Sequence, residues 1–273
     1  MAGRLCLLLN LACLMPACGD ALADAALPDA VPAASAPADV YAGTVERNKA
    51  IASRATGVTY PYHVYLPAGY ATSGKRYPVI YATDGQWNFR SFSRMLDQRG
   101  KAMILVGIEQ GGPEPDRRAV DYTVDGAPAY IRFLREELVP AIEATYRTSP
   151  SRTFAGTSYG GLLGSLMLGS EAVTTPFFRN YLLFDGAFWA QTATSIQAEE
   201  ARFAASPRLP VHLILTSASA PGNVEDVAAY EARYRHRGYV ELVIDRKDFA
   251  VPHDRVAKPS FDWAIDLLDE GLS

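Results

Sequence analysis

Cysteine is almost absent from this sequence, and the few cysteines lie at the extreme N-terminus. The chain has three, Cys6, Cys13 and Cys18. All fall in or beside a segment with the features of a secretory leader, so cleavage at Ala23 would leave a mature chain without cysteine. This excludes disulfides, thiol catalysis and a cysteine metal site from the mature protein.

Long apolar runs, internal repeats and an excess of one charge are also missing. Beyond the leader, no segment is apolar over the length that a membrane-spanning helix needs. The formal net charge is −4, and the leader holds one Arg and one Asp, so its removal leaves that charge unchanged. This weak acidity gives no electrostatic reason to expect nucleic acid or an anionic membrane surface as a partner.

The N-terminus combines a basic start, a short apolar stretch from Leu5 to Met15 and an Ala-Leu-Ala cleavage signal ending at Ala23. We therefore expect residues 1–23 to be a signal peptide and the protein to be exported, either periplasmic or secreted. The alternative is a lipoprotein signal ending at Cys18, which would then carry a lipid anchor. Residues 24–40, rich in Ala, Pro and Asp, are predicted to be a flexible linker, and residues 41–273 to form one domain.

Strand-like and helix-like segments alternate through this domain. The predicted strands are Thr59–Leu66, Val79–Ala82, Met103–Ile108, Thr153–Ala155, Tyr181–Phe184, Val211–Thr216 and Val240–Ile244. The predicted helices are Pro128–Tyr146, Tyr159–Leu168, Glu225–Arg237 and Phe261–Leu268. The alternation predicts an α/β fold with a mainly parallel central sheet, helices on both faces and room for only a small lid.

One motif stands between a predicted strand and a predicted helix: Gly156-Thr-Ser-Tyr-Gly160. A Gly-x-Ser-x-Gly sequence in this place is typical of a tight strand-to-helix turn that exposes a serine hydroxyl above the sheet. The backbone packs so closely there that the flanking positions favour glycine. Ser158 is therefore the candidate nucleophile.

Such a serine needs a histidine as general base, and the chain has four histidines. His63 and His212 lie within predicted strands, and His236 lies on the charged surface of a predicted helix. His253 alone follows a strand by a loop near the C-terminus, where loops gather above the sheet. We predict His253 to be the base.

The acid that orients the histidine is less well defined by the sequence. The segment after the strand that ends at Thr216 holds Asp226 and Glu225, which are equally suited to the first turn of a helix. Asp185, directly after the strand that ends at Phe184, is a third candidate. We place Asp226 first, then Glu225, then Asp185; a Ser-His dyad oriented by water or a backbone carbonyl is a further alternative.

An oxyanion hole requires two backbone N–H groups. One is expected from Tyr159, directly after the nucleophile, and the other from the loop after the strand that ends at Ala82. That loop contains Gly85, which permits a sharp turn, and Gln86 is the predicted second donor. No metal or organic cofactor is expected for this chemistry.

The chain resembles the putative esterase family of α/β-hydrolases, which includes siderophore (enterochelin-type) esterases, S-formylglutathione hydrolases, feruloyl esterases and antigen 85-type mycolyltransferases. The similarity runs from about Tyr60 onward. It is carried by Val64–Tyr70, Tyr77–Gln86, Arg117–Tyr122, Ala129–Glu143, the serine motif, and His253 before a terminal helix. The resemblance, nearest to the siderophore-esterase branch, implies Ser158 and His253 as nucleophile and base, and Tyr159 with Gln86 as oxyanion donors.

Residues near the predicted site leave substrate questions open. Four aromatic residues there are equally consistent with a substrate wall and with packing: Trp87, Phe89, Phe188 and Trp189. Arg117 and Arg118 are expected in a loop, either solvated or facing an anionic substrate. The main hypothesis is an exported serine esterase acting on a small-molecule ester, with siderophore-type or aromatic acyl esters favoured. An acyltransferase on the same machinery and a catalytically silent binding protein are the alternatives.

Overall fold

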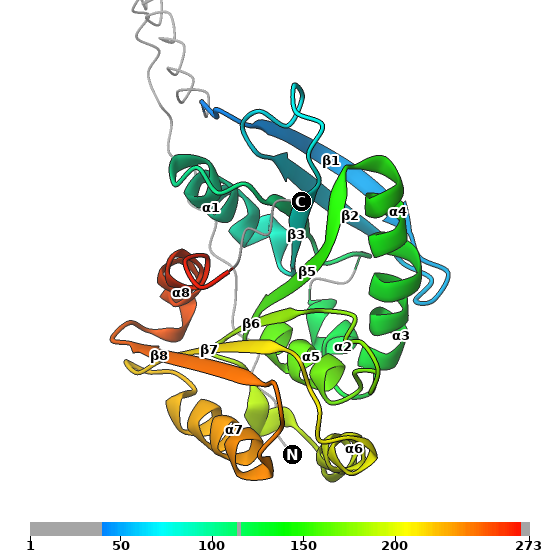
Figure 1. Cartoon of the computed structure of the whole chain (residues 1–273). Helices are drawn as coiled ribbons and strands as arrows, with labels where there is room; N and C mark the ends of the chain where they lie inside the picture. Colours follow the sequence, from blue (N-terminus) through cyan, green and yellow to red (C-terminus); the bar gives the residue numbers. More distant parts are fainter. Residues whose placement is uncertain (1–39, 114–115, 269–273) are drawn as a thin grey trace, which may run out of the picture. The chain divides into compact units, whose positions relative to one another are not determined.

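The computed structural model describes residues 40–113 and 116–268. The predicted leader and nearly all of the predicted linker lie outside the described residues. Eight strands form one sheet in the order β1-β2-β4-β3-β5-β6-β7-β8 (Figure 1). They are β1 (Thr44–Ala52), β2 (Thr59–Leu66), β3 (Tyr77–Ala82), β4 (Ile104–Ile108), β5 (Thr148–Thr157), β6 (Asn180–Phe184), β7 (His212–Ala218) and β8 (Val243–Phe249).

The first strands are antiparallel and the rest are parallel. β1 pairs with β2, and β2 with β4, in antiparallel register. From β4 through β3, β5, β6 and β7 to β8 all pairs are parallel. The predicted mainly parallel α/β-hydrolase sheet is thus confirmed. Because these strands are parallel, the carboxyl ends of β3 and β5–β8 all lie at the same end of the sheet, which we call the carboxyl edge.

Helices cover both faces of the sheet. Along β3, Val79 and Tyr81 belong to one buried cluster, while Ile80 and Ala82 belong to the other. The helical segments are α1 (Gly85–Gln98), α2 (Arg118–Asp121), α3 (Ala127–Arg132), η1 (Phe133–Leu138), α4 (Val139–Thr145), α5 (Tyr159–Leu168), η2 (Phe188–Ala190), α6 (Ala193–Ala205), α7 (Val224–Arg237), η3 (His253–Arg255) and α8 (Ala257–Ala264). α1 and α8 pack together on one face, where the Phe92 and Phe261 rings stack with centroids 3.9 Å apart.

The predicted helix Pro128–Tyr146 is one continuous helical segment with an unusual middle. α3 passes into the π-helix η1, which passes into α4. Pro140, near the start of α4, has no N–H and its ring would clash with the carbonyl one α-turn earlier. The wider turn of a π-helix directly before it accommodates that clash. α3, η1 and α4 cover the face of the sheet opposite α1 and α8 (Figure 1).

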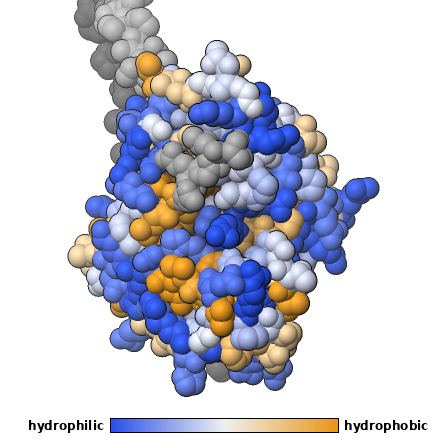
Figure 2. Space-filling model, in the orientation of Figure 1, coloured by the Kyte–Doolittle hydropathy of each residue, from blue (hydrophilic) through white to orange (hydrophobic). Residues whose placement is uncertain are grey.

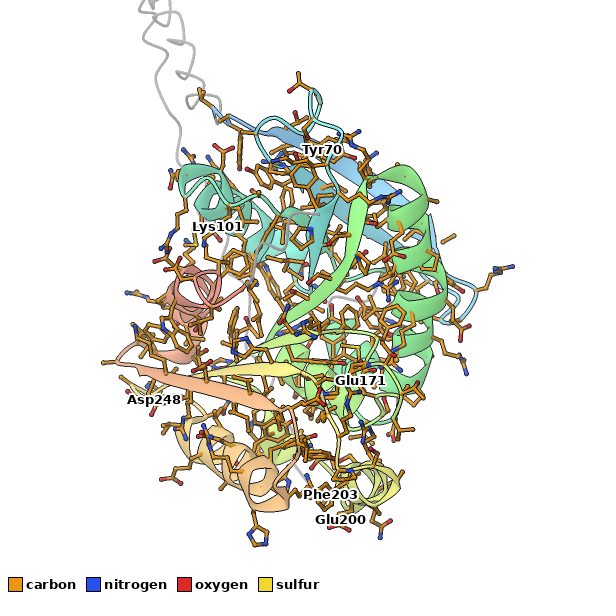
Figure 3. The ribbon with its side chains drawn as sticks, viewed as in Figure 1. Tyr70, Lys101, Glu171, Glu200, Phe203 and Asp248 are labelled. Carbon is orange, nitrogen blue, oxygen red and sulfur yellow. The ribbon has the colours of Figure 1, made fainter. Side chains whose placement is uncertain are left out.

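The surface is mixed in polarity. On the face shown in Figure 2, apolar residues form small patches between hydrophilic ones. Charged side chains such as Glu200 on α6 and Asp248 on β8 lie at the periphery in Figure 3. Among the described residues, no helix combines the length and apolar character needed to cross a bilayer.

Candidate active site

Ser158 lies at the turn between β5 and α5, as predicted. Its backbone has φ 59° and ψ −115°, a conformation that is costly for any residue other than glycine. The Ser158 N–H donates to the carbonyl of Phe184 over 2.9 Å, and its own carbonyl accepts from Ala187 N over 3.0 Å. These bonds attach the turn to the end of the adjacent strand β6, and so hold a strained serine in place.

The two glycines of the motif are required by close packing. A Cβ on Gly156 would lie 2.3 Å from the carbonyl oxygen of Gly160. A Cβ on Gly160 would lie 2.4 Å from Oγ1 of Thr83, which follows β3. The turn that carries the serine is therefore packed directly against the turn that follows β3.

The carboxylate partner of His253 is Asp185. His253 Nδ1 lies 2.5 Å from Asp185 Oδ2. The Asp185 carboxyl is completely buried, and its Oδ1 accepts from the N–H groups of Ala218 and Asn223, each over 2.9 Å. A buried carboxyl group that accepts two backbone hydrogen bonds and faces an imidazole has the environment of an ionised carboxylate, which can only accept. We therefore assign His253 the tautomer with its proton on Nδ1, which leaves Nε2 as the basic nitrogen.

The structure places Asp185, the third-ranked candidate acid, and not the first-ranked Asp226, against His253. Asp226 and Glu225 both lie in the first turn of α7, where they complement the helix dipole. Neither is hydrogen-bonded to His253, whose Nδ1 faces Asp185. The loop after β7 instead supplies Asn223, whose N–H and side-chain Nδ2 donate to Asp185 Oδ1 and to the Asp185 carbonyl. The loop after β7 thus holds Asp185 in place, while Asp185 itself follows β6.

The predicted oxyanion donors lie at the N-termini of two helices. α1 begins at Gly85, directly before Gln86, and α5 begins at Tyr159. The first N–H groups of a helix have no acceptor within it and carry its positive dipole end. The Gln86 and Tyr159 N–H groups thus follow the carboxyl ends of β3 and β5, which are neighbours in the sheet.

Asp84 and Arg118 form a pair between these two turns, a feature that the sequence did not reveal. Asp84 is 1% exposed, and its Oδ2 accepts from Arg118 Nη2 over 3.1 Å. Burial raises the pKa of Asp84 to about 6, although the positive charge of Arg118 opposes this shift. Arg118, expected in a loop, lies on the short helix α2 and is largely buried.

Backbone strain concentrates at this edge. Five residues other than glycine have positive φ among residues 40–113 and 116–268. Three of them are Asp84 at 59°, Ser158 at 59° and Asp185 at 45°. Such conformations persist only where surrounding contacts impose them, and they gather at functional sites.

The sequence matches the family described as putative esterase over residues 53–231. The chain belongs to the putative esterase family. A Bacillus subtilis relative, the uncharacterized protein YbbA, is 25% identical over 154 residues, which are 48% of this chain and 58% of that protein. The chain thus spans little more than half the length of that relative.

Solved structures share the fold of this esterase-family chain. An IroE-like serine hydrolase from Shewanella oneidensis has a TM-score of 0.69 at 23% identity, over 82% of this chain and 78% of that one. The siderophore hydrolase EstB from Aspergillus nidulans has a TM-score of 0.69 at 19% identity, over 86% and 98% of the two chains. The BES protein from Bacillus cereus has a TM-score of 0.69 at 21% identity, over 81% and 93%.

The aromatic residues near the site divide into two groups. Phe89 and Phe188 are buried and belong to the core. Trp87 and Trp189 are each 58% exposed. Trp189 lies 6.1 Å from the Tyr159 ring, and the guanidinium of Arg118 lies 5.3 Å from the Trp87 ring. The two indoles are therefore exposed, Trp189 beside Tyr159 and Trp87 beside Arg118.

The other three histidines lie on the predicted elements. On β2, His63 Nε2 lies 2.6 Å from Glu109 Oε1. On β7, His212 Nε2 lies 2.7 Å from Asp245 Oδ2, and His236 is exposed on α7. Within the described part of the chain, no three His, Cys, Asp or Glu side chains are grouped as metal ligands.

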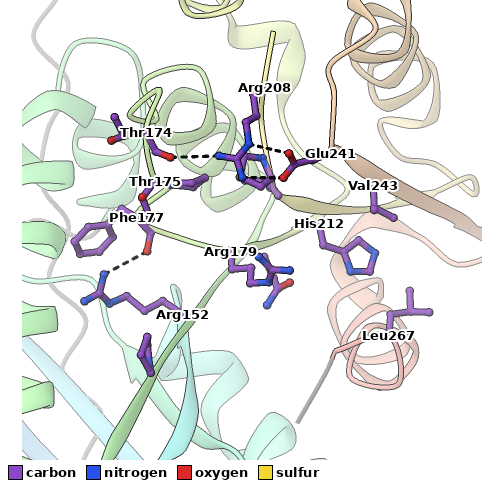
Figure 4. Close-up of a pocket in the computed structure, with 15 residues that line it drawn as sticks. Arg152, Thr174, Thr175, Phe177, Arg179, Arg208, His212, Glu241, Val243 and Leu267 are labelled. Atoms are coloured by element: carbon purple, nitrogen blue, oxygen red, sulfur yellow. Dashed lines mark hydrogen bonds and ion pairs between the residues drawn. The ribbon is translucent and has the colours of Figure 1, made fainter. Parts of the chain in front are cut away.

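A cavity of about 730 Å³ lies at the opposite edge of the sheet (Figure 4). Its lining includes Asn180 and His212, the first residues of β6 and β7, and none of the proposed catalytic residues. Arg208 on its wall is paired with Glu241 over 2.8 Å and 2.9 Å. Since reactive groups in this fold gather at the carboxyl ends of the strands, we place the active site at the other edge.

Proposed function

We propose that this protein is an exported serine carboxylic-ester hydrolase, with Ser158 as nucleophile, His253 as general base and Asp185 as the residue that orients the base. The observation that carries the proposal is the placement of the strained Ser158 turn beside the pair formed by the buried Asp185 and the partly exposed His253. Ser158 N bonds to Phe184 O, and Asp185 is the next residue along the chain. Membership of an esterase family supports ester hydrolysis as the reaction.

In the acylation half-reaction, Ser158 Oγ attacks the ester carbonyl carbon while His253 Nε2 takes the hydroxyl proton. The carbonyl oxygen becomes negative, and the N–H groups of Gln86 and Tyr159 donate to it. The bond to the alcohol oxygen then breaks. His253 gives the proton to that oxygen, so the alcohol leaves neutral and the acyl group stays on Ser158.

In the deacylation half-reaction, water takes the place of the alcohol. His253 Nε2 removes a proton from water as its oxygen attacks the acyl carbon, and Ser158 leaves with that proton. Throughout, Asp185 accepts the hydrogen bond from Nδ1 and stabilises the imidazolium that forms twice per turnover. The side chain of His253 is 41% exposed, so water can reach the base.

Siderophore-type or aromatic acyl esters are the favoured substrates. Two indoles are exposed, Trp189 beside Tyr159 and Trp87 beside Arg118, and aromatic rings stack on such surfaces with a gain of about 0.5–1.5 kcal/mol beyond area burial. The siderophore hydrolase EstB has the same fold, which is consistent with this class. Trp87→Ala and Trp189→Ala should raise KM for aromatic esters more than for acetyl esters.

The case for export rests on the leader alone. A signal peptide over residues 1–23, or lipidation at Cys18, would deliver the mature chain to the periplasm or the medium. Mass spectrometry of the processed protein distinguishes the two, because one leaves a free N-terminus at Asp24 and the other a lipid on Cys18.

The first test is hydrolysis of p-nitrophenyl acetate by the mature protein and by Ser158→Ala. We expect turnover in the wild type and a loss of about 10⁶-fold in kcat in the variant, as for removal of a serine nucleophile. A fluorophosphonate should label Ser158 in the wild type alone. Absence of both turnover and labelling would support a silent binding protein instead. Transfer to an added alcohol in preference to water would support an acyltransferase.

A further inference from the structure

The two proposed oxyanion donors come from segments that are far apart in sequence. Gln86 follows β3, and Tyr159 follows β5. An oxyanion hole works only if both N–H groups lie about 2.7–3.1 Å from one oxygen atom. Displacement of one donor by about 1 Å can cost about 10²-fold in rate, so the two turns must be held at a fixed separation.

Arg118 bonds to both turns. Its Nη2 donates to Asp84 Oδ2 over 3.1 Å, and Asp84 directly precedes α1 and its Gln86. The same Nη2 donates to the Thr157 carbonyl over 3.3 Å, and Thr157 directly precedes Ser158. One guanidinium group thus joins the residue before one helix N-terminus to the residue before the nucleophile.

Arg118 is itself held firmly. Its guanidinium carbon lies 5.3 Å from the Trp87 ring and 5.7 Å from the Tyr159 ring. Its helix α2 is anchored by the neighbouring Asp121, which accepts from Arg117 Nε over 3.0 Å and from the Tyr60 hydroxyl over 2.8 Å. The buried hydroxyl of Tyr60 ties α2 to β2, so Arg118 extends from a fixed base.

We propose that Arg118 is a positioning residue of the reaction, which fixes the separation of the Gln86 and Tyr159 N–H groups through its bonds to Asp84 and to the Thr157 carbonyl. This inference rests on the proposed esterase function. This role differs from substrate binding, because Arg118 Nη2 donates to Asp84 and to the Thr157 carbonyl, both of which belong to the protein.

The Asp84–Arg118 ion pair is not expected to add much to the free energy of unfolding. A buried ion pair loses its hydration, and apolar residues of similar volume often stabilise a protein as well or better. Burial raises the pKa of Asp84 to about 6, so the folded protein holds this carboxylate ionised at neutral pH against an unfavourable environment. Asp116 adds to this cost and Arg118 reduces it. A contact that costs free energy at an active-site edge is more readily explained by geometry than by stability.

The experiment compares wild type with Arg118→Ala, Arg118→Lys and Asp84→Asn. Asparagine suits position 84 because it tolerates the left-handed conformation there, φ 59° and ψ 39°. Arg208→Gln is the matched control, since Arg208 also pairs with a carboxylate but lies at the opposite edge of the sheet. For each protein, kcat and KM are measured with p-nitrophenyl acetate, which is neutral, and the melting temperature is recorded.

We expect Arg118→Ala to lose about 10²-fold in kcat with little change in KM. Methylguanidinium at millimolar concentration should restore part of this loss by entering the space between the Trp87 and Tyr159 rings. Arg118→Lys should remain less active than the wild type, because the lysine side chain is shorter and its ammonium lacks the planar guanidinium that lies over the Trp87 and Tyr159 rings. Asp84→Asn should lose kcat without a lower melting temperature, and Arg208→Gln should match the wild type.

Several outcomes would overturn the proposal. One is a change confined to KM in Arg118→Ala. Another is an unchanged kcat in both Arg118→Ala and Asp84→Asn. A third is a kcat loss that follows the melting temperature and is not rescued by methylguanidinium. Failure of the proposed function is a separate result: it would appear as no turnover in the wild type, or as equal turnover in Ser158→Ala.

Discussion

Replacement of Asp185 by asparagine is the sharpest test of the catalytic assignment. The Asp185→Asn change would keep the size of the side chain while removing its charge and placing an amide before His253 Nδ1. The Nδ1 proton would lose its acceptor whenever the amide N–H₂ faces it, so the imidazole would favour the tautomer with its proton on Nε2. In that tautomer Nε2, which we propose as the acceptor of the Ser158 proton, cannot accept it.

The magnitude follows from the contacts of Asp185. A matched Asp-to-Asn change in a serine triad lowers kcat about 10⁴-fold, which is roughly 5.4 kcal/mol of transition-state stabilisation at about 1.36 kcal/mol per decade. Stability should fall less. The asparagine oxygen can still accept from Ala218 N and Asn223 N, each 2.9 Å from Asp185 Oδ1 in the wild type. We expect a loss of about 1–2 kcal/mol, the difference between charged and neutral hydrogen bonds.

The matched control is Asp226→Asn. Asp226 lies in the first turn of α7 and does not bond to His253, so only its favourable interaction with the helix dipole is lost, about 0.3–1 kcal/mol of stability. Steady-state kinetics with p-nitrophenyl acetate and urea unfolding are measured for both variants. The assignment fails if Asp226→Asn loses activity like a triad variant while Asp185→Asn retains it.

Three further predictions concern the elbow, a buried carboxylate and pH. Gly156→Ala should abolish activity because its Cβ would lie 2.3 Å from the Gly160 carbonyl oxygen, whereas Gly74→Ala, with no atom within 4 Å, should not; both are checked by the acetate assay. Glu199 is 1% exposed and pairs with Arg233 and Arg237, so Glu199→Ala should cost roughly 3–5 kcal/mol in urea unfolding. Its control, Glu241→Ala, breaks a solvent-exposed pair with Arg208 and should change stability by at most about 1 kcal/mol. The pKa of Asp84 is raised from 3.8 to about 6 on folding, so ionised Asp84 destabilises the folded state. This cost is absent below about pH 4 and complete above about pH 6, at roughly 3 kcal/mol. The stability of Asp84→Asn relative to wild type should therefore increase from pH 4 to pH 7, and a pH-independent difference in unfolding free energy would contradict the reasoning.

Apolar pattern and turn chemistry were enough to predict most of the fold. β2 and α5 have the predicted bounds, and the buried strands β3, β4, β6 and β7 differ by a few residues at their ends. The outer strands were harder. β1 was not predicted at all, because its sequence Thr-Val-Glu-Arg-Asn-Lys-Ala-Ile-Ala is largely polar. Edge strands are often charged to avoid pairing with other chains, and this removes the pattern by which strands are found.

The last parallel strand shows the same effect. The apolar run Val240–Ile244 predicted a strand, but β8 is Val243–Phe249 and continues through Asp-Arg-Lys-Asp. Pairing with β7 alone supports those residues, and charged side chains remain solvated at the edge. The whole of α1 (Gly85–Gln98) was missed, for another reason: it begins at the Asp84-Gly85 pair, which is also a common turn sequence. Only close packing distinguishes a helix start here, since a Cβ on Gly85 would lie 2.6 Å from the Gly107 carbonyl carbon.

Which carboxylate faces His253 could not be read from the sequence, because it depends on which strand end lies beside the Ser158 turn. β6 is the direct neighbour of β5, so Asp185, the first residue after β6, is held at the Ser158 turn by the bond from Ser158 N to Phe184 O. The residues after β7 are one strand further away. Asn223 from that loop, together with Ala218 N at the end of β7 itself, donates hydrogen bonds that orient the carboxylate of Asp185. A left-handed φ of 45° turns Asp185 out of the strand direction and toward His253. Asp185, Ser158 and Asp84 thus share one physical feature: each is a residue other than glycine, with positive φ, in a turn at a strand end. The flanking glycines are a visible signature of the Ser158 turn, whereas the strain at Asp185 and Asp84 is imposed by tertiary contacts. Sequence pattern therefore singled out Ser158, placed Asp185 only third among the candidate acids and did not single out Asp84.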